Sequence, residues 1–150
     1  MEQSDCVSLN HTCFTVTDIG KTIQFFEECL GYQVELRQQV PGVIGRLIGV
    51  ADATAEQAFL TGNGSRIELL CYQSPPNRTV ISSTPVDTGS VHIGVYVDDA
   101  KAAVAKATGH GFALLGDFIE VDSDHFSSPV NAVAWVRNSD GITVEFLEME

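Results

Sequence analysis

The sequence contains the same structural unit twice, and this internal repeat restricts the possible folds more than any other feature. Each copy begins with alternating apolar residues, reaches an Asp at which a helix can begin, and continues as an apolar stripe with helical spacing. In the first copy His11 precedes Asp18 by seven positions, and in the second copy His92 precedes Asp99 by seven positions. We therefore expect two copies of one module in this chain.

The pattern within each copy predicts the order β-α-β-β-β. The first helix is expected between Asp18 and Gly31, and the second between Asp98 or Asp99 and the glycines near position 110. Strands are expected to restart near Tyr32 and Phe112. A final strand in each copy carries a glutamate, Glu68 or Glu145, four residues after a turn glycine. Two more strands per copy are expected at about 37–48 and 57–60, and at about 113–120 and 132–137.

The length and the repeat together predict one α+β domain over residues 1–150. Module 1 is expected at about 7–73 and module 2 at about 90–150. The segment between them, about 74–89, is rich in Pro, Ser and Thr and is typical of a linker.

Composition excludes several function classes. The net charge is −12 and the eight Lys and Arg residues are dispersed, so the chain should repel nucleic acid and anionic membranes. No apolar run approaches the length of a membrane span, and the polar first ten residues predict no signal peptide. We therefore expect a cytoplasmic protein whose four scattered cysteines are free thiols. These are Cys6, Cys13, Cys29 and Cys71.

Strand alternation places two histidines and two glutamates on equivalent faces of the two modules. Phe14 and Val16 point away from His11, and the unbroken aliphatic row 91–97 that a helix would cover points away from His92. Glu68 and Glu145 occupy matched positions in the two copies. Taken singly, each His could be a hydrogen-bonded core residue, and Glu68 could pair with Arg66. Two imidazoles and two carboxylates together form a ligand set suited to a divalent first-row metal.

The chain resembles the vicinal oxygen chelate superfamily, which includes glyoxalase I, methylmalonyl-CoA epimerase, extradiol dioxygenases, and bleomycin and fosfomycin resistance proteins. The resemblance is carried by LNHTCFTVTDIGKTIQFFEECLGYQV, RIELLCYQSP, SVHIGVYVDDAKAAVAKATGHGF and VAWVRNSDGITVEFLEM. It implies a glyoxalase-like fold in which two tandem βαβββ modules form a curved mixed-sheet half-barrel, usually in a homodimer. His11, Glu68, His92 and Glu145 fall on the family's four metal-ligand positions. The turn RNSDG departs from a common DPDG-like turn but keeps Asp140 and Gly141.

The resemblance implies three alternative functions. A fourth protein ligand at Glu68 favours a metal-dependent isomerase or lyase of the glyoxalase or epimerase type, with Glu145 and Glu68 as catalytic carboxylates and Ni, Zn or Co as the metal. A ring-cleaving extradiol dioxygenase would use His11, His92 and Glu145 with Fe or Mn. A resistance-type protein would only bind a ligand. In every case the expected partner is a small molecule.

A few other residues are candidates for contact with the substrate. Those that share the ligand faces or a neighbouring strand are Cys13, Tyr72, Tyr96 and Arg137. His110 is expected to be a solvated turn residue. The segment 117–131, including His125, matches no motif, although His125 could belong to a lid.

Overall fold

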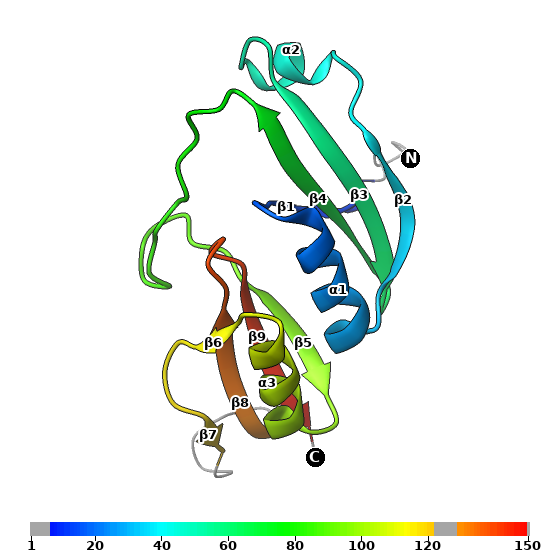
Figure 1. Ribbon diagram of the computed structural model, residues 1–150. Helices are drawn as coiled ribbons and strands as arrows, with labels where there is room; N and C mark the ends of the chain where they lie inside the picture. The colour runs from blue at the N-terminus through cyan, green and yellow to red at the C-terminus, as the bar shows by residue number, and fades with distance from the viewer. Residues whose placement is uncertain (1–6, 122–128, 150) are drawn as a thin grey trace, which may run out of the picture.

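The computed structural model describes residues 7–121 and 129–149, and it contains two modules of matching topology (Figure 1). Among these residues, no helix has both the length and the apolar character needed to cross a membrane. The elements of the first module are β1 (Thr12–Thr15), α1 (Ile19–Leu30), β2 (Gln33–Gln39), α2 (Ile44–Ile48), β3 (Thr54–Gly62) and β4 (Ser65–Ser74). Those of the second are β5 (Ile93–Val97), α3 (Ala100–Gly109), β6 (Ala113–Leu114), β7 (Ile119–Glu120), β8 (Val130–Arg137) and β9 (Thr143–Met149).

The two sheets repeat the same strand order and register. The first sheet is ordered β1-β4-β3-β2 and the second β5-β9-β8-β6, with β7 also paired to β8. In each sheet the first strand runs parallel to the last, and Cys13 lies opposite Glu68 as Gly94 lies opposite Glu145. This arrangement confirms the predicted α+β fold of two βαβββ units that form no closed barrel.

Both long helices begin at the predicted aspartates. The Asp18 side chain accepts a hydrogen bond from the Lys21 amide at 3.0 Å, and that of Asp99 accepts one from the Ala102 amide at 2.8 Å. Helix α1 ends at Gly31, whose φ of 70° is a left-handed conformation that glycine adopts without steric cost. The repeated His-to-Asp spacing therefore corresponds to the same strand-to-helix connection in both modules.

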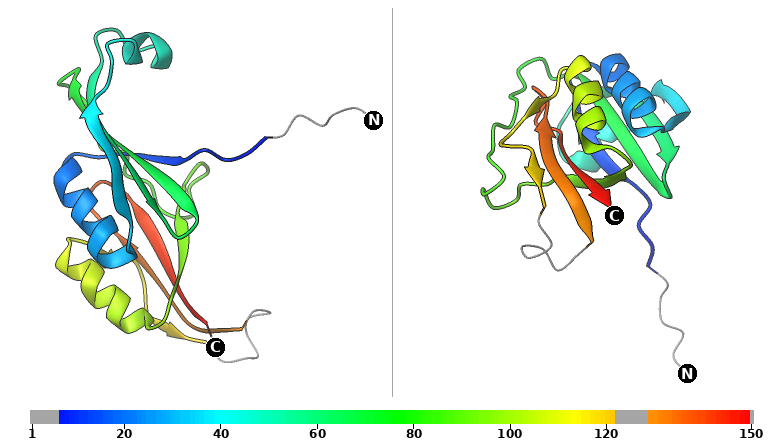
Figure 2. Two further views of the ribbon diagram at one scale, coloured as in Figure 1. Left: turned by 90° about the vertical axis from the view of Figure 1, so that its right-hand side faces the viewer. Right: turned by 90° about the horizontal axis from the view of Figure 1, so that it is seen from below.

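The modules share one hydrophobic core, and helices α1 and α3 lie side by side on the same side of the molecule (Figure 2). Phe25 of α1 is 1% exposed and stacks on Phe112 of module 2 with ring centroids 3.9 Å apart. A second link runs from Thr17 to Asp140, whose carboxylate accepts from the Thr17 amide at 3.0 Å and from its hydroxyl at 2.7 Å. These contacts hold the two sheets in a fixed relative position, and among the described residues the sheets do not pair along their edges.

His110 is not the solvated turn residue that its glycine neighbours suggest. Its Nε2 lies 3.1 Å from Glu28 Oε2 of the other module, and its ring lies edge-on to Phe25. The side chain is only 20% exposed. The turn brings His110 against α1 because α1 and α3 pack together, which local sequence cannot reveal.

Two of the predicted strands are wrong in extent. The strand expected at 37–48 ends at Gln39, and 44–48 form helix α2, because Pro41 and Gly42 interrupt the sheet hydrogen bonding. Gly45 lets this helix pack closely, since a Cβ there would lie 2.6 Å from the Val50 carbonyl oxygen. The strand expected at 113–120 is two short strands, β6 and β7, that flank a bend.

Candidate functional site

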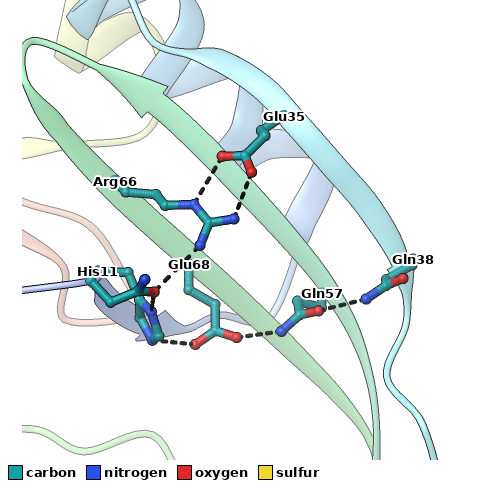
Figure 3. Close-up of polar contacts among 7 residues, drawn as sticks. His11, Glu35, Gln38, Gln57, Arg66 and Glu68 are labelled. Atoms are coloured by element: carbon teal, nitrogen blue, oxygen red, sulfur yellow. Dashed lines mark hydrogen bonds and ion pairs between the residues drawn. The ribbon is translucent and has the colours of Figure 1, made fainter.

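The first predicted pair, His11 and Glu68, is in direct contact (Figure 3). His11 lies immediately before β1, and its Nε2 is 3.0 Å from Oε2 of Glu68 on β4. The other imidazole nitrogen, Nδ1, is 2.7 Å from Asn10 Oδ1. The other carboxylate oxygen, Oε1, accepts a hydrogen bond from Gln57 Nε2. Glu68 is buried, so these contacts compensate for much of the hydration that its charge loses.

Two further groups extend this contact into a chain of polar side chains along the sheet (Figure 3). Arg66 donates to both oxygens of Glu35, at 2.9 and 2.7 Å, and to Asn10 Oδ1 at 3.3 Å. Its guanidinium lies 3.8 Å from the centroid of the Phe59 ring. At the opposite end, Gln38 Nε2 donates to Gln57 Oε1 at 3.0 Å. His11 and Glu68 are therefore held from both sides.

The second predicted pair, His92 and Glu145, repeats this geometry in module 2. His92 Nε2 lies 3.5 Å from Glu145 Oε2. Glu145 Oε1 accepts a hydrogen bond from Trp135 Nε1 at 3.0 Å, and the His92 and Trp135 rings lie 4.2 Å apart between centroids. In both modules, therefore, one carboxylate oxygen faces an imidazole and the other accepts a hydrogen bond from a neutral side chain.

The strand registers show which neighbours are equivalent. Phe59 lies directly opposite Glu68, and Trp135 lies directly opposite Glu145. Gln57 lies two residues before Phe59 on β3, so its equivalent on β8 is Val133, two residues before Trp135. The ligand positions are thus preserved between the modules, whereas the residue that donates to each carboxylate comes from a different position.

Each His–Glu pair has the atom types and the spacing expected of two ligands that bind one metal ion. Nitrogen and oxygen ligands about 2.0–2.2 Å from one ion lie roughly 3 to 3.5 Å apart, which matches the two imidazole-to-carboxylate distances. Hydrogen bonds to Nδ1 of His11 and to Oε1 of each glutamate fix the orientation of these three ligands, as is usual for residues that hold metals. In residues 7–121 and 129–149, however, no three His, Cys, Asp or Glu side chains converge on one point. The structure brings the four predicted ligands together as two pairs and not as one set.

The predicted substrate contacts differ in their surroundings. Cys13 is exposed but lies next to Glu68, and partial desolvation followed by the Glu68 charge raises the pKa of its thiol to about 12, which keeps it protonated at neutral pH. Burial also raises the pKa of Tyr72, with smaller effects from Cys13 and Glu68. Tyr96 is 74% exposed on the face that Gly94 shares. Within the described part of the chain, Cys13, Cys29 and Cys71 are free thiols, as expected.

Arg137 lies in the wall of a cavity of about 540 Å³ beside Glu145. It donates to the carbonyl oxygen of Ser83 and, at 2.7 Å, to the Thr143 hydroxyl. The predicted linker therefore does more than join the modules, because it is attached to β8 and forms one side of this cavity. The walls include Thr84, Pro85, Leu115, Ile119, Val133 and Trp135. His125 lies outside the described residues.

Sequence reasoning missed the residues that orient the ligands. Asn10 adjoins a predicted ligand, but Gln57 and Trp135 are recognisable only when the register of β3 against β4 and of β8 against β9 is known. For Gln57, the signal that the sequence offers is a polar side chain within the alternating pattern of β3.

The family model for the glyoxalase/bleomycin resistance protein/dioxygenase superfamily matches residues 8–146. A curated relative, 2-epi-5-epi-valiolone epimerase from Actinomyces sp., is 31% identical over 117 residues, which cover 74% of this chain. The chain spans 63% of the length of that relative.

Solved structures show the same fold. A glyoxalase family protein from Bacillus cereus superposes with a TM-score of 0.83 at 23% identity, covering 99% of this chain and 98% of that one. The trypanothione-dependent glyoxalase I of Leishmania major superposes with a TM-score of 0.59 at 23% identity, covering 95% and 87%. The fosfomycin resistance protein FosX of Mesorhizobium loti gives 0.60 at 11% identity, covering 97% and 94%. From the match over residues 8–146 and this shared fold, the chain belongs to the glyoxalase/bleomycin resistance protein/dioxygenase superfamily.

Proposed function

We propose that this protein is a divalent-metal-dependent isomerase that moves a proton on a carbon beside a carbonyl group of a small molecule. The observation that carries the proposal is the matched geometry of the two His–Glu pairs. In both, the imidazole Nε2 faces one carboxylate oxygen, and a neighbouring donor occupies the other. Two unrelated surface ion pairs would have no reason to share this arrangement of imidazole, carboxylate and second donor at equivalent positions of the two modules.

We further propose that two copies of the chain complete the metal centre. Each pair supplies two ligands, whereas catalytic metal sites usually have at least three protein ligands. His11 and Glu68 of one copy would therefore combine with His92 and Glu145 of a second copy. The two modules share one core, and in residues 7–121 and 129–149 the two pairs do not converge on one point, which supports completion between chains rather than within one chain.

The proposed chemistry needs a base near the carbonyl and a means of stabilising negative charge on its oxygen. A bound divalent metal supplies the second requirement as a Lewis acid. The carboxylates supply the first: one accepts the proton from the carbon, the electron pair of that C–H bond forms a double bond to the carbonyl carbon, and the π pair of the carbonyl moves to its oxygen. The same carboxylate can return the proton to the neighbouring carbon, whereas inversion of the first carbon requires the second carboxylate to deliver a proton to its opposite face.

The curated relative supports this reaction class. Its name describes an epimerase of 2-epi-5-epi-valiolone, and epimerisation beside a carbonyl is one form of the proposed proton transfer. We therefore suggest assaying a panel that contains this compound, an α-hydroxy thiohemiacetal, an α-chiral acyl thioester and a catechol. Turnover of the catechol alone would refute the isomerase proposal in favour of a ring-cleaving oxygenase.

Complementation between two inactive variants tests the shared centre directly. One variant carries His11→Ala with Glu68→Gln, and the other carries His92→Ala with Glu145→Gln. If centres form between copies, a mixed dimer has one intact centre and one empty centre, so mixing should restore metal binding to a fraction of the chains. If centres form within one chain, every centre in the mixture remains broken. Metal content and light scattering of the mixture distinguish the two outcomes.

A further inference from the structure

Each module has a cross-strand pair of one Arg and one Thr at the same place in its sheet, with the two residues exchanged. In module 1, Thr61 on β3 lies opposite Arg66 on β4. In module 2, Arg137 on β8 lies opposite Thr143 on β9. Each pair is two residues along the ladder from the pair that contains the predicted glutamate ligand. Both modules therefore place one guanidinium beside the candidate site.

The charge of Arg66 is compensated within its own sheet. The guanidinium donates to both oxygens of Glu35, at 2.9 and 2.7 Å, and it lies over the Phe59 ring. A two-point contact between a guanidinium and a carboxylate is among the strong hydrogen-bonded pairs in proteins. Arg66 is therefore committed to Glu35 and not to a ligand.

Arg137 is held by neutral oxygens instead of a carboxylate. Its Nε donates to the Thr143 hydroxyl at 2.7 Å, and its Nη1 donates to the carbonyl oxygen of Ser83 in the linker. The Thr143 hydroxyl donates its own proton to the Gly141 carbonyl at 3.1 Å, so it can only accept from Arg137. In residues 7–121 and 129–149, no carboxylate lies within ion-pair distance of Arg137. Its positive charge is therefore oriented but not neutralised.

The guanidinium of Arg137 is half-buried in the wall of the cavity of about 540 Å³ that also contains Glu145 and Trp135. Partial removal of water strengthens the attraction of such a group for an anion. Asp117 lines the same cavity but is exposed, so solvent and salt weaken its repulsion of an anion. The chain has a net charge of −12, so an anionic molecule can be attracted only by a local cation such as Arg137.

We infer that the substrate carries a carboxylate or phosphate group and that Arg137 selects it by binding this group. The inference rests on the proposed function, because it concerns the same cavity beside Glu145. Within the described part of the chain, Nη2 of Arg137 has no hydrogen-bond partner, and Nη1 keeps a second N–H after its bond to Ser83. This edge of the guanidinium can donate to two oxygens of one anion. The carbon skeleton would then lie against Trp135, with the anionic group beyond it.

Binding of simple anions to metal-free protein tests the inference, since no probe can then bind through a metal. Trp135 is the single tryptophan of the chain and lies in the cavity wall, so its fluorescence reports occupancy. The probes are cyclohexyl phosphate, cyclohexanecarboxylate and neutral cyclohexanol, which share one ring. We expect the wild type to bind at least one anion about tenfold or more tightly than cyclohexanol, because hydrogen bonds to charged groups are stronger than neutral ones. The anion that binds more tightly identifies the group that the substrate carries.

Two substitutions separate the charge of Arg137 from its contact with the linker. Arg137→Gln removes the charge but keeps an N–H donor for Ser83, whereas Arg137→Lys keeps the charge. We expect Arg137→Gln to lower the affinity for the preferred anion about tenfold or more and that for cyclohexanol less than about twofold. Arg137→Lys should retain most of the anion affinity. Arg46→Gln is the matched control, because Arg46 is exposed on α2 and does not line this cavity.

A residue that only anchors the linker predicts a different pattern. Arg137→Gln and Arg137→Lys would then change the binding of all three probes alike, or change none, and either result would overturn the inference. Equal affinity of the wild type for the three probes would also overturn it, and this comparison needs no variant that could disturb the fold. Anion binding through Arg137 in a protein that neither holds a divalent metal nor converts any panel compound would refute the proposed function and leave the anion site. Turnover of a neutral panel compound without anion binding would refute this inference alone.

Discussion

The contact between Phe25 and Phe112 should determine whether the two modules unfold together. Phe25 is 1% exposed, stacks on Phe112 at 3.9 Å and meets Phe26 edge-on at 5.4 Å between centroids. A buried Phe removes about 150–250 Å² from water, which corresponds to roughly 4–6 kcal/mol at 25 cal/mol per Å². Alanine keeps a small part of that burial, so we expect Phe25→Ala to lower the free energy of unfolding by about 3–5 kcal/mol.

Urea unfolding followed by circular dichroism and by Trp135 fluorescence measures this loss. Trp135 reports on module 2, whereas the substitution lies in module 1, so a shared core predicts one transition that both signals follow. Leu47→Ala on α2 is the control, because Leu47 is 78% exposed and its loss should change stability by no more than about 0.5 kcal/mol. A loss below about 1.5 kcal/mol, or fluorescence that does not respond to Phe25→Ala, would refute a core shared between the modules.

Three other predictions address the site and its support. If a metal binds at the two pairs, chelation should lower the melting temperature and added Ni²⁺, Zn²⁺ or Co²⁺ should restore it; a melt insensitive to both would count against the centre. Glu68→Gln and Glu145→Gln should each lower turnover at least about 100-fold in an isomerase, whereas a three-ligand oxygenase would tolerate the change at Glu68. Thr17→Val removes the hydroxyl bond to Asp140, and we expect urea titration to show a loss of about 1 kcal/mol in the free energy of unfolding.

The repeat made much of the fold predictable because its spacing is set by local geometry. A strand followed by an aspartate that caps a helix depends on neighbouring residues alone, so the same spacing produced these elements twice, although α1 is capped by Gly31 and α3 by His110. Alternation likewise placed each His and Glu on the face away from the helices. The contacts of His11 with Glu68 and of His92 with Glu145 follow from the parallel pairing of the first and last strands.

Features that depend on distant parts of the chain were not predictable in this way. Alternation indicates the face of a strand but not its register, so the donors Gln57 and Trp135 could not be assigned to their carboxylates. The linker reads as a polar connector, and only its attachment to Arg137 shows that it lines a cavity. Helix α2 lies where a strand was expected, since Pro41 ends the sheet pairing and short apolar segments suit either structure.

The differences between the modules suggest how a substrate would lie in a centre built from one half of each. The free oxygen of Glu68 accepts from the amide of Gln57, which Gln38 contacts in turn, whereas the cavity beside Glu145 has an indole and mainly aliphatic walls. A shared metal would constrain the ligand positions but not their neighbours, and here one set of neighbours is polar and the other mainly apolar. A bound molecule would thus meet hydrogen-bonding groups on one face and apolar groups on the other. We expect its oxygen-bearing side to face Gln57 and its less polar side to face Trp135, which would fix the face of the carbon that each carboxylate approaches.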